Sequence, residues 1–309
     1  MGNIRELDKR RKSIRNIRKI TRTMELIATA RFKKAMDRAS AANDYTQRIT
    51  AIVRDLAAAG LDVSHPLLAE RPVVKSATML MLTSNRGLCG GYNGSVIRAA
   101  VQRRDELTAK SDAFRFEISG KRGIAAMKFR RVIIDQMYTE FEDQPVFEEV
   151  AKIADRLMED FISGRMDRLD IAYTRFVSIS RQVATVETLL PFSALSAEEN
   201  TLQTDDNSAG PQATVDAATG SQVSEYEFLP SPESILEEVV PASFRVKLFK
   251  CFLDAAVSEQ IARMVAMKSA TENAGEIIKQ LSMTFNRARQ AKITQEIMEI
   301  IGGVEALEG

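Results

Sequence analysis

Two long helical segments, one at each end of the chain, most constrain how this sequence can fold. Between Asn3 and Leu56 there is neither proline nor glycine, and apolar or small residues recur at steps of three and four. The same spacing returns between Ala242 and Leu307. At 1.5 Å per residue each helix would be roughly 80–100 Å long, several times the width of a small domain. Such a helix needs a partner along its length, so the pattern predicts a coiled coil.

The middle of the chain separates the two segments, so the simplest pairing is antiparallel, with both termini at one end. The seam is expected to contain the recurring apolar or small residues of both segments. These include Ile4, Leu7, Ile14, Ile17, Met24, Ile27 and Ala35 of the first segment and Phe252, Ala256, Ile261, Ile277, Leu281, Phe285 and Ala288 of the second. The second segment is the longer, so its last turns should project beyond the N-terminus. A lone helix that is apolar on most sides needs a surrounding partner, which predicts insertion into an apolar protein collar; the alternative is a frayed tail. The apolar residues of these turns are Ile293, Ile297, Met298, Ile300, Ile301, Val304 and Leu307.

Composition places the chain among soluble folded proteins, with 45% hydrophobic and 28% charged residues. No apolar run of membrane-spanning length occurs, so no transmembrane span is expected. The basic N-terminus could be a mitochondrial transit peptide, but a helical seam that begins at Ile4 favours mature protein. Two cysteines, Cys89 and Cys251, are too few for a disulfide framework and favour a reducing cytoplasm.

Charge is divided unevenly along the sequence. Residues 1–60 contain fifteen Lys and Arg against six Asp and Glu, whereas residues 61–241 contain nineteen against twenty-eight. The basic first helix is either a solvated face or a docking surface for acidic protein loops or nucleic acid. A nucleic-acid-binding protein with a basic coiled-coil arm is therefore an alternative function, and it predicts strongly salt-dependent binding.

The middle of the chain alternates between strand-like and helix-like runs. This alternation predicts a Rossmann-like α/β domain with a largely parallel sheet covered on both faces and a final antiparallel pair. The resulting organisation is an N-terminal coiled-coil helix (1–60), an α/β domain (61–230) and a C-terminal coiled-coil helix (231–309). The strands are expected at 76–83, 114–119, 132–138, 169–179 and 183–189, and the helices at 94–107, 123–129 and 146–162.

Two further features bound the C-terminal helix. Residues 193–224 contain almost no large apolar groups and predict a mobile loop. Pro230 and Pro232 open the last helical region, and Pro241 fits either a helix start or a kink.

No catalytic, cofactor or metal site is predicted. The glycine-rich run 85–93 follows a strand, where a dinucleotide-binding fold places its phosphate loop, but its spacing departs from G-x-G-x-x-G. The run 119–122 resembles the end of a P-loop, yet Arg122 replaces the residue that would hold magnesium. A tight turn is the better interpretation of the glycines. The single histidine, His65, has no suitably placed partner for a zinc site or a catalytic triad.

Four motifs in order resemble the gamma subunit, the central-stalk rotor of F-type ATP synthases, over nearly the whole chain. K-I-T and M-E in 19–25 match its first helix, and R-G-L-C-G-G in 86–91 matches its glycine turn. S-E-Q-I-A-R-M-V-A-M-K-S-A in 258–270 and A-R-Q-A-K-I-T-Q-E-I in 288–297 match its second helix and its C-terminal signature.

The resemblance implies a non-catalytic rotor of a proton-translocating ATP synthase at the cytoplasmic face of a bacterial inner membrane. The coiled coil would turn inside a hexameric ring of alpha and beta subunits. The middle domain would form a foot that sits with the epsilon subunit on the membrane c ring. Rotation would change the conformation of each catalytic site in turn. No cofactor, nucleic acid or transmembrane span of its own is implied.

The resemblance also implies contact residues. Arg289 and Gln290, with Thr294 and Glu296 one turn further on, would catch loops of the beta subunit. Ile297 and Ile301 belong to the tip that turns in the apolar sleeve. Met24 would lie near acidic lever loops of the beta subunit, and Arg86 in the glycine turn would join it. The loop 193–224 looks longer than is usual in the family, and no paired-cysteine regulatory insertion is present.

Overall fold

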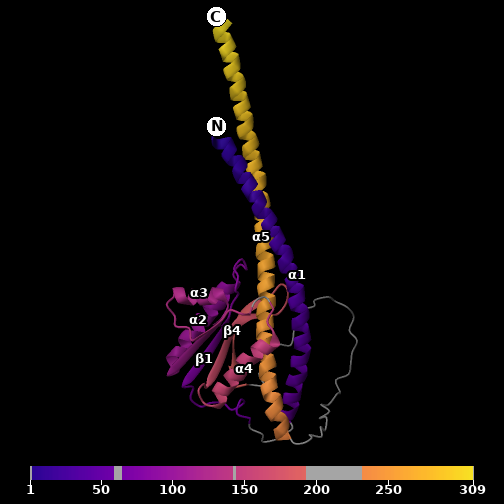
Figure 1. Cartoon of the computed structure of the whole chain (residues 1–309), viewed down its shortest axis with the longest axis vertical. Helices are drawn as coiled ribbons and strands as arrows, with labels where there is room; N and C mark the ends of the chain where they lie inside the picture. The colour runs from indigo at the N-terminus through magenta and orange to yellow at the C-terminus, as the bar shows by residue number, and fades with distance from the viewer. Residues whose placement is uncertain (1, 59–64, 142–143, 193–231, 309) are drawn as a thin grey trace, which may run out of the picture.

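The computed structural model of the chain describes residues 2–58, 65–141, 144–192 and 232–308. Its two longest elements, α1 (Gly2–Ala58) and α5 (Pro232–Glu308), form an antiparallel pair. An α/β part lies beside one half of this pair, while the other half extends away from it (Figure 1). We call the α/β part with the adjoining stretch of α5 the foot, and residues 2–30 with 264–308 the shaft.

The foot is built on a five-stranded sheet in the order β3-β2-β1-β4-β5. Neighbouring strands are parallel from β3 to β4, and β5 pairs antiparallel with β4. This topology confirms the predicted Rossmann-like arrangement with its final antiparallel pair. The strands are β1 (Ser76–Leu82), β2 (Ala113–Ser119), β3 (Gln136–Tyr138), β4 (Arg168–Phe176) and β5 (Gln182–Leu190). The remaining helices are α2 (Tyr92–Lys110), α3 (Lys121–Phe129) and α4 (Phe147–Ile162).

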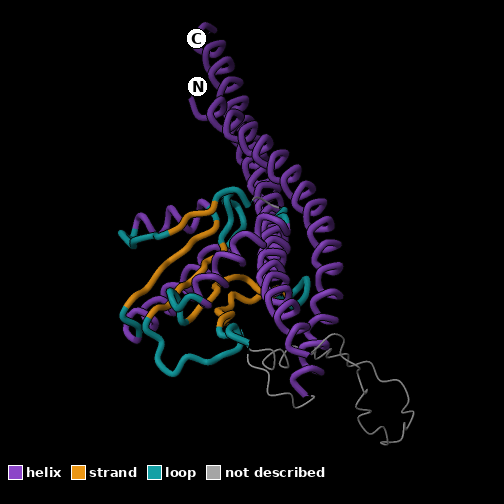
Figure 2. Tube along the Cα trace, turned by 60° about the horizontal axis from the view of Figure 1, so that its bottom comes forward, coloured by secondary structure: helices purple, strands orange, loops and turns teal. Residues whose placement is uncertain are grey.

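Helices cover both faces of this sheet, because alternate side chains of a buried strand point in opposite directions. On β1, Met79 and Met81 pack into an apolar cluster with α2 and α3. Leu80 and Leu82 pack into a second cluster with α4 and α5. Phe244 of α5 is completely buried in the second cluster. The long helix α5 therefore packs against the core of the foot and also forms one of the two helices of the shaft (Figures 1 and 2).

Two predicted strands are longer than the observed ones, and local turns explain both differences. The prediction of 132–138 is wrong for its first residues, and β3 begins only at Gln136. Arg131 adopts a positive φ of 57°, and the Val132 N–H donates to the Met127 carbonyl, so these residues close α3 instead. Likewise β4 ends at Phe176, because a tight turn closed by hydrogen bonds between 177–178 and Arg181 follows it.

Contacts between the paired helices fix their direction and register. The Thr271 hydroxyl donates to the Thr21 hydroxyl at 2.8 Å, and the Arg11 guanidinium lies 4.5 Å from the centre of the Phe285 ring. Because the helices are antiparallel and rise equally per residue, the nine described residues before Arg11 on α1 lie beside the residues that follow Phe285 on α5, up to about Thr294. The α5 residues beyond that point have no α1 neighbour, as Figure 1 shows, so the predicted projecting end is confirmed.

The seam of the shaft is more polar than the sequence pattern predicts. Arg11 and Thr21 face α5, whereas the expected seam residues Ile17, Ile27 and Ile277 are 44%, 47% and 42% exposed. That part of the prediction is wrong. The heptad that faces α5 places Ala28 and Ala35 in buried positions, because small side chains let the two backbones approach closely. Leu7 and Ile14 are half-buried at the same heptad position, as the sequence pattern predicts.

Three predictions concern the ends of the C-terminal helix and the domain boundaries. The loop 193–224 and the boundaries at residues 60 and 230 lie outside the described residues and stay predictions. Pro241 lies inside α5, so it does not mark the start of this helix. No helix in the described ranges has an apolar stretch of the length and hydropathy needed to cross a membrane.

Candidate functional site

The outward surface of the shaft exposes large aliphatic side chains that no described segment of this chain covers. Ile20 and Leu26 on α1 are 58% and 56% exposed, and Val265 and Met283 on α5 are 57% and 58% exposed. Basic residues surround them, and the shaft consists of two helices that bury side chains only where they face each other. Apolar groups spread around a two-helix rod are unfavourable in water unless a partner surrounds them.

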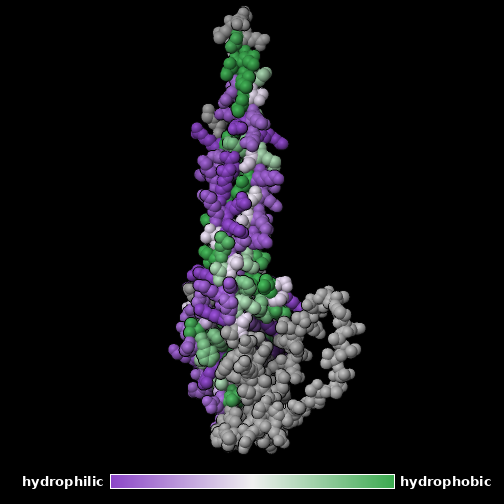
Figure 3. Space-filling model, turned by 90° about the vertical axis from the view of Figure 1, so that its right-hand side faces the viewer, coloured by the Kyte–Doolittle hydropathy of each residue, from purple (hydrophilic) through white to green (hydrophobic). Residues whose placement is uncertain are grey.

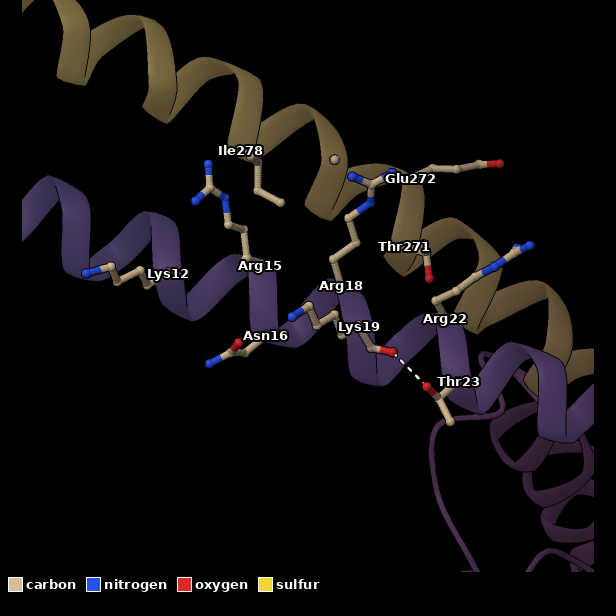
Figure 4. A pocket seen from close by; sticks show the side chains of 11 residues that line it. Lys12, Arg15, Asn16, Arg18, Lys19, Arg22, Thr23, Thr271, Glu272 and Ile278 are labelled. Carbon is tan, nitrogen blue, oxygen red and sulfur yellow. Dashed lines mark hydrogen bonds between the residues drawn. The ribbon is translucent and has the colours of Figure 1, made fainter.

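A basic groove runs between the two helices of the shaft, with a volume of about 1270 Å³. Arg15, Arg18 and Arg22 extend from α1 toward α5 across it (Figure 4). On the α5 side the groove contains Glu272 as its one carboxylate, with Gly275 beside the Arg18 guanidinium. The other lining residues are Lys12, Asn16, Lys19, Thr23, Thr271 and Ile278. Cations thus outnumber carboxylates strongly, and the groove suits an acidic ligand surface.

Short ion pairs along α1 compensate part of this positive charge. Asp8 accepts from Arg11 at 2.6 Å and from Lys12 at 3.0 Å, and these two partners lower the pKa of its carboxyl group. Glu25 accepts from Arg22 at 2.7 Å. Pairs of this kind on an exposed helix are weak, because water and salt screen the two charges. These pairs do not involve Arg15, Arg18 or Lys19, so the groove stays basic.

The projecting end of α5 is the most continuous apolar surface of the shaft. Its exposed aliphatic residues gather near the far end in Figure 3, above a shaft that is mainly hydrophilic. Positions 293, 297, 298, 300, 301 and 304 fall within an arc of about 160° at 100° per residue, so they form one broad apolar face and do not surround the helix as the sequence analysis expected. Their exposures are Ile293 47%, Ile297 51%, Met298 63%, Ile300 67%, Ile301 53% and Val304 51%.

The predicted contact residues fall into three separate places. Residues 289–301 lie on the last turns of α5, where Arg289 and Gln290 are exposed just before the projecting end and the Thr294 hydroxyl donates to the Gln290 carbonyl at 3.0 Å. Glu296 and Lys292 form an ion pair at 3.3 Å on the same turns. The half-buried Met24 lies lower on the shaft, near Thr271, about 27 Å from Arg289 along the helix. Arg86 lies at the foot.

Side chains of the glycine turn (residues 84–93) bond within the turn and also cover the start of α3. The Asn93 amide group donates to the Ser84 hydroxyl at 2.8 Å, and the Ser84 N–H donates to the Asn93 side-chain oxygen at 3.0 Å. The N–H groups of residues 121–123, at the start of α3, donate to the Asn85 side chain, the Ser84 carbonyl and the Thr83 hydroxyl at 3.0, 3.1 and 2.9 Å. Phosphate binding at a helix N-terminus needs such N–H groups to be open. The first turn of α3, which follows the run 119–122, therefore offers no open N–H groups to a phosphate.

This turn is also attached to the long helix α5. The Tyr92 hydroxyl donates to the Ala255 carbonyl at 3.1 Å, and a Cβ placed on Gly90 would lie only 3.8 Å from the Ala266 side chain. Gly90 has a positive φ of 55°, so glycine allows both the turn and the close approach. Arg86 is thereby held next to the junction of foot and shaft.

Other candidate reactive groups are buried and structural. Cys89 and Cys251 are each 2% exposed, and burial raises the pKa of the Cys251 thiol. The His65 ring accepts the Leu67 N–H on Nδ1 at 3.1 Å, and burial lowers its pKa. Within the described part of the chain, no three His, Cys, Asp or Glu side chains gather as metal ligands.

The sequence analysis missed two sets of residues. The cations Arg15, Arg18 and Arg22 recur at steps of three and four, which is the signal that places them on one helix face. Glu259 lies between Asp254 and Arg263 in α5, and the structure buries all three charged residues. No sequence signal separates them from the exposed charges of the same helix.

Comparisons with known proteins agree with this architecture. The family model described as ATP synthase matches residues 3–307. The ATP synthase gamma chain of Rhodopirellula baltica is 60% identical over 311 residues and covers all of both chains. That of Saccharopolyspora erythraea is 39% identical and covers 99% of this chain and 98% of its own.

Solved structures share the fold at lower identity. The rotor of Euglena gracilis mitochondrial ATP synthase matches with a TM-score of 0.62 at 19% identity, over 94% of this chain and 99% of its own. The central stalk and c-ring structure of Tetrahymena thermophila mitochondrial ATP synthase matches with a TM-score of 0.55 at 18% identity, over 81% and 99%. With full-length relatives and an antiparallel two-helix shaft on an α/β foot, this chain belongs to the family of ATP synthase gamma chains.

Proposed function

We propose that this chain is the central rotor shaft of a proton-translocating F-type ATP synthase. In this role it couples proton flow through the membrane c ring to conformational changes in the catalytic alpha and beta subunits, for synthesis or hydrolysis of ATP. The observation that carries the proposal is the shaft itself, a two-helix rod with exposed aliphatic and basic residues on its sides and an apolar projecting end. Such a rod is stable in water only inside a partner.

Each part of the molecule has a partner in this proposal. The projecting end, with Ile297 and Ile301, turns in an apolar sleeve at the top of the hexameric alpha–beta ring. The basic groove and the neighbouring Met24 meet acidic loops of the beta subunit, because a cationic stripe attracts and orients acidic segments. The foot sits with the epsilon subunit on the c ring.

The rotor performs no reaction of its own in this proposal. The enclosed glycine turn and the structural roles of Cys89, Cys251 and His65 support a subunit that transmits force to catalytic neighbours. An asymmetric shaft presents different residues to successive catalytic sites as it turns, and each site responds by a change of conformation.

We further place the complex at the cytoplasmic side of a bacterial inner membrane, where this chain is a peripheral subunit. Its 60% identity with the Rhodopirellula baltica gamma chain supports this placement. The nucleic-acid-binding alternative loses its support, because the basic face belongs to a shaft of the gamma chain family.

Replacing Arg289 with alanine should weaken coupling much more than the same change on the foot. Arg289 is exposed on the last turns of α5, just before the projecting end, and an arginine that is enclosed by a partner commonly contributes more than about 1 kcal/mol to an interface. Arg289→Ala should therefore lower ATP-driven proton pumping per ATP hydrolysed, or the affinity for the ring, by about tenfold. Both are measured on the reconstituted complex.

Arg130→Ala is the matched control, because Arg130 is an exposed arginine on the foot. It should leave pumping and assembly unchanged. Equal effects of the two substitutions would count against the proposed contacts of the projecting end.

A further inference from the structure

Leu88 in the glycine turn combines an exposed side chain with a backbone conformation that leucine rarely adopts. The residue is 59% exposed, and its φ of 67° lies in the left-handed region that favours glycine. Such a conformation persists only where the surrounding structure fixes it, and residues that adopt it gather at functional sites. Leu88 is therefore a residue whose place in the turn calls for an explanation outside the turn.

Hydrogen bonds fix the turn on both sides of Leu88. The Ser84 hydroxyl donates to the Arg86 carbonyl, and the Asn93 amide group donates to the Cys89 sulfur at 3.1 Å. Cys89 is buried, so the chain turns inward directly after Leu88. An aliphatic side chain on a turn that is already fixed loses little conformational freedom when a partner covers it.

The turn lies at the end of the foot from which the shaft extends. The Tyr92 hydroxyl binds the Ala255 carbonyl of α5, and Gly90 approaches Ala266, which belongs to the shaft. Figure 1 shows α3, whose start the turn covers, at the same end of the foot. Val265, beside Ala266 in the sequence, is 57% exposed and adds a second aliphatic side chain at this junction.

A guanidinium group lies beside the turn. A Cβ placed on Gly87 would lie 2.7 Å from Nη2 of Arg122, so the end of the Arg122 side chain packs against the Gly87 backbone. Among the described residues, no carboxylate pairs with Arg122 or with the preceding Lys121. An exposed aliphatic group beside cations of this kind fits a partner surface in which carboxylates border an apolar pocket.

We propose that Leu88 is an anchor residue that inserts into an apolar pocket of the alpha–beta ring, on a loop whose carboxylates pair with Arg122. This inference rests on the proposed function, which surrounds the shaft with this ring. The ring is the partner that fits, because the turn lies where the shaft leaves the foot. The cations of the turn also require the same acidic chemistry as the basic groove of the shaft.

The test is binding of the full-length chain to the purified alpha–beta ring, with the melting temperature of each variant as a second measurement. Leu88→Ala removes most of the side chain and should weaken binding about tenfold. Leu88→Gly also relieves the left-handed strain, so it should weaken binding at least as much and leave the melting temperature unchanged or raised. Ile133→Ala is the matched control, because Ile133 is an aliphatic residue of the foot that is 83% exposed, and it should have no effect.

Arg122→Gln tests the charged part of the proposed contact. This substitution should weaken binding and make it less dependent on salt, because it removes an attraction that salt screens. Leu88→Ala should leave the salt dependence of binding as it is in the unaltered chain.

The outcomes separate the two proposals. Failure of the unaltered chain to bind the ring overturns the proposed function itself. If the unaltered chain binds, then an L88A or L88G variant that binds as tightly as I133A overturns the anchor role alone. A fall in the melting temperature of L88G that accounts for its weaker binding shows a merely structural role and also overturns it. An R122Q variant that keeps the salt dependence of the unaltered chain overturns the acidic border of the pocket.

Discussion

Replacing Gly120 with alanine is expected to cost the foot about 3–5 kcal/mol of unfolding free energy. Gly120 follows β2 with a φ of 102°, and a Cβ at this position would lie 2.0 Å from the backbone carbonyl oxygen of Thr83. Backbone atoms cannot move aside as the end of a flexible side chain can. The Gly120 N–H also donates to the Tyr138 carbonyl, so a shift here disturbs the ends of three neighbouring strands.

Tyrosine fluorescence during urea unfolding measures this effect, because the chain has no tryptophan and Tyr92, Tyr138 and Tyr173 are buried in the foot. Gly164→Ala is the matched control. Gly164 also has a positive φ, 74°, but nothing lies within 4 Å of an added Cβ. Gly164→Ala should lower the free energy of unfolding by only about 1–2 kcal/mol, which is the cost of placing a residue with a Cβ in the left-handed backbone region. Equal losses for both variants would mean that the close approach of Thr83 does not matter.

Replacing Asp254 with asparagine should stabilise the protein at alkaline pH. Asp254 on α5 is 7% exposed, and burial raises the pKa of its carboxyl group to about 7. Lys250 and Lys247 on the same helix and Arg175 on β4 favour the charged form, whereas Glu187 on β5 disfavours it. The effect of burial on the pKa of Asp254 is larger than the opposing effect of the nearby positive charges.

The sign of the pH dependence follows from this raised pKa. The folded chain holds the proton up to about pH 7, while an unfolded aspartate releases it near pH 3.8. The stability that this group contributes is therefore fully present below about pH 4 and is lost as the pH rises through 7. Above pH 7 the folded state contains a buried carboxylate, at a cost of up to about 4 kcal/mol, because the pKa is raised from 3.8 to about 7 and one pKa unit equals about 1.4 kcal/mol.

Urea unfolding at a series of pH values checks this prediction. Asp254→Asn should be more stable than the parent by about 2–4 kcal/mol at pH 8, and the difference should shrink as the pH falls toward 4. Glu149→Gln, which changes an exposed carboxylate of α4, should show no comparable trend. A constant difference between Asp254→Asn and the parent at all pH values would contradict the account.

Much of the fold could be predicted because its elements follow local rules. The alternation of apolar strands and helices located all five strands of the sheet, and the last two paired antiparallel as expected. Errors arose at strand ends, where the cap after α3 and the turn after β4 replaced extended backbone. These turns depend on backbone geometry that a run of apolar residues such as Val132 does not reveal.

The shaft was harder to predict in detail. The spacing of three and four correctly indicated paired helices, but it assigned Ile17, Ile27 and Ile277 to a seam that contains Arg11 and Thr21 instead. Apolar residues on a helix usually mark the face toward the core of the same chain. In a shaft enclosed by other subunits they also mark the outer face, and a single sequence does not distinguish the two.

The central claim is that the two helices turn together as one stiff shaft, and a reversible cross-link between them tests it most directly. The hydroxyl groups of Thr21 and Thr271 are 2.8 Å apart, so cysteines at these positions are placed to form a disulfide. The measurement is ATP-driven proton pumping by the assembled complex that carries both substitutions, before oxidation, after oxidation and after reduction. The account predicts unchanged pumping in all three states, because the helices keep their relation during rotation. Loss of pumping on oxidation that returns on reduction would contradict it.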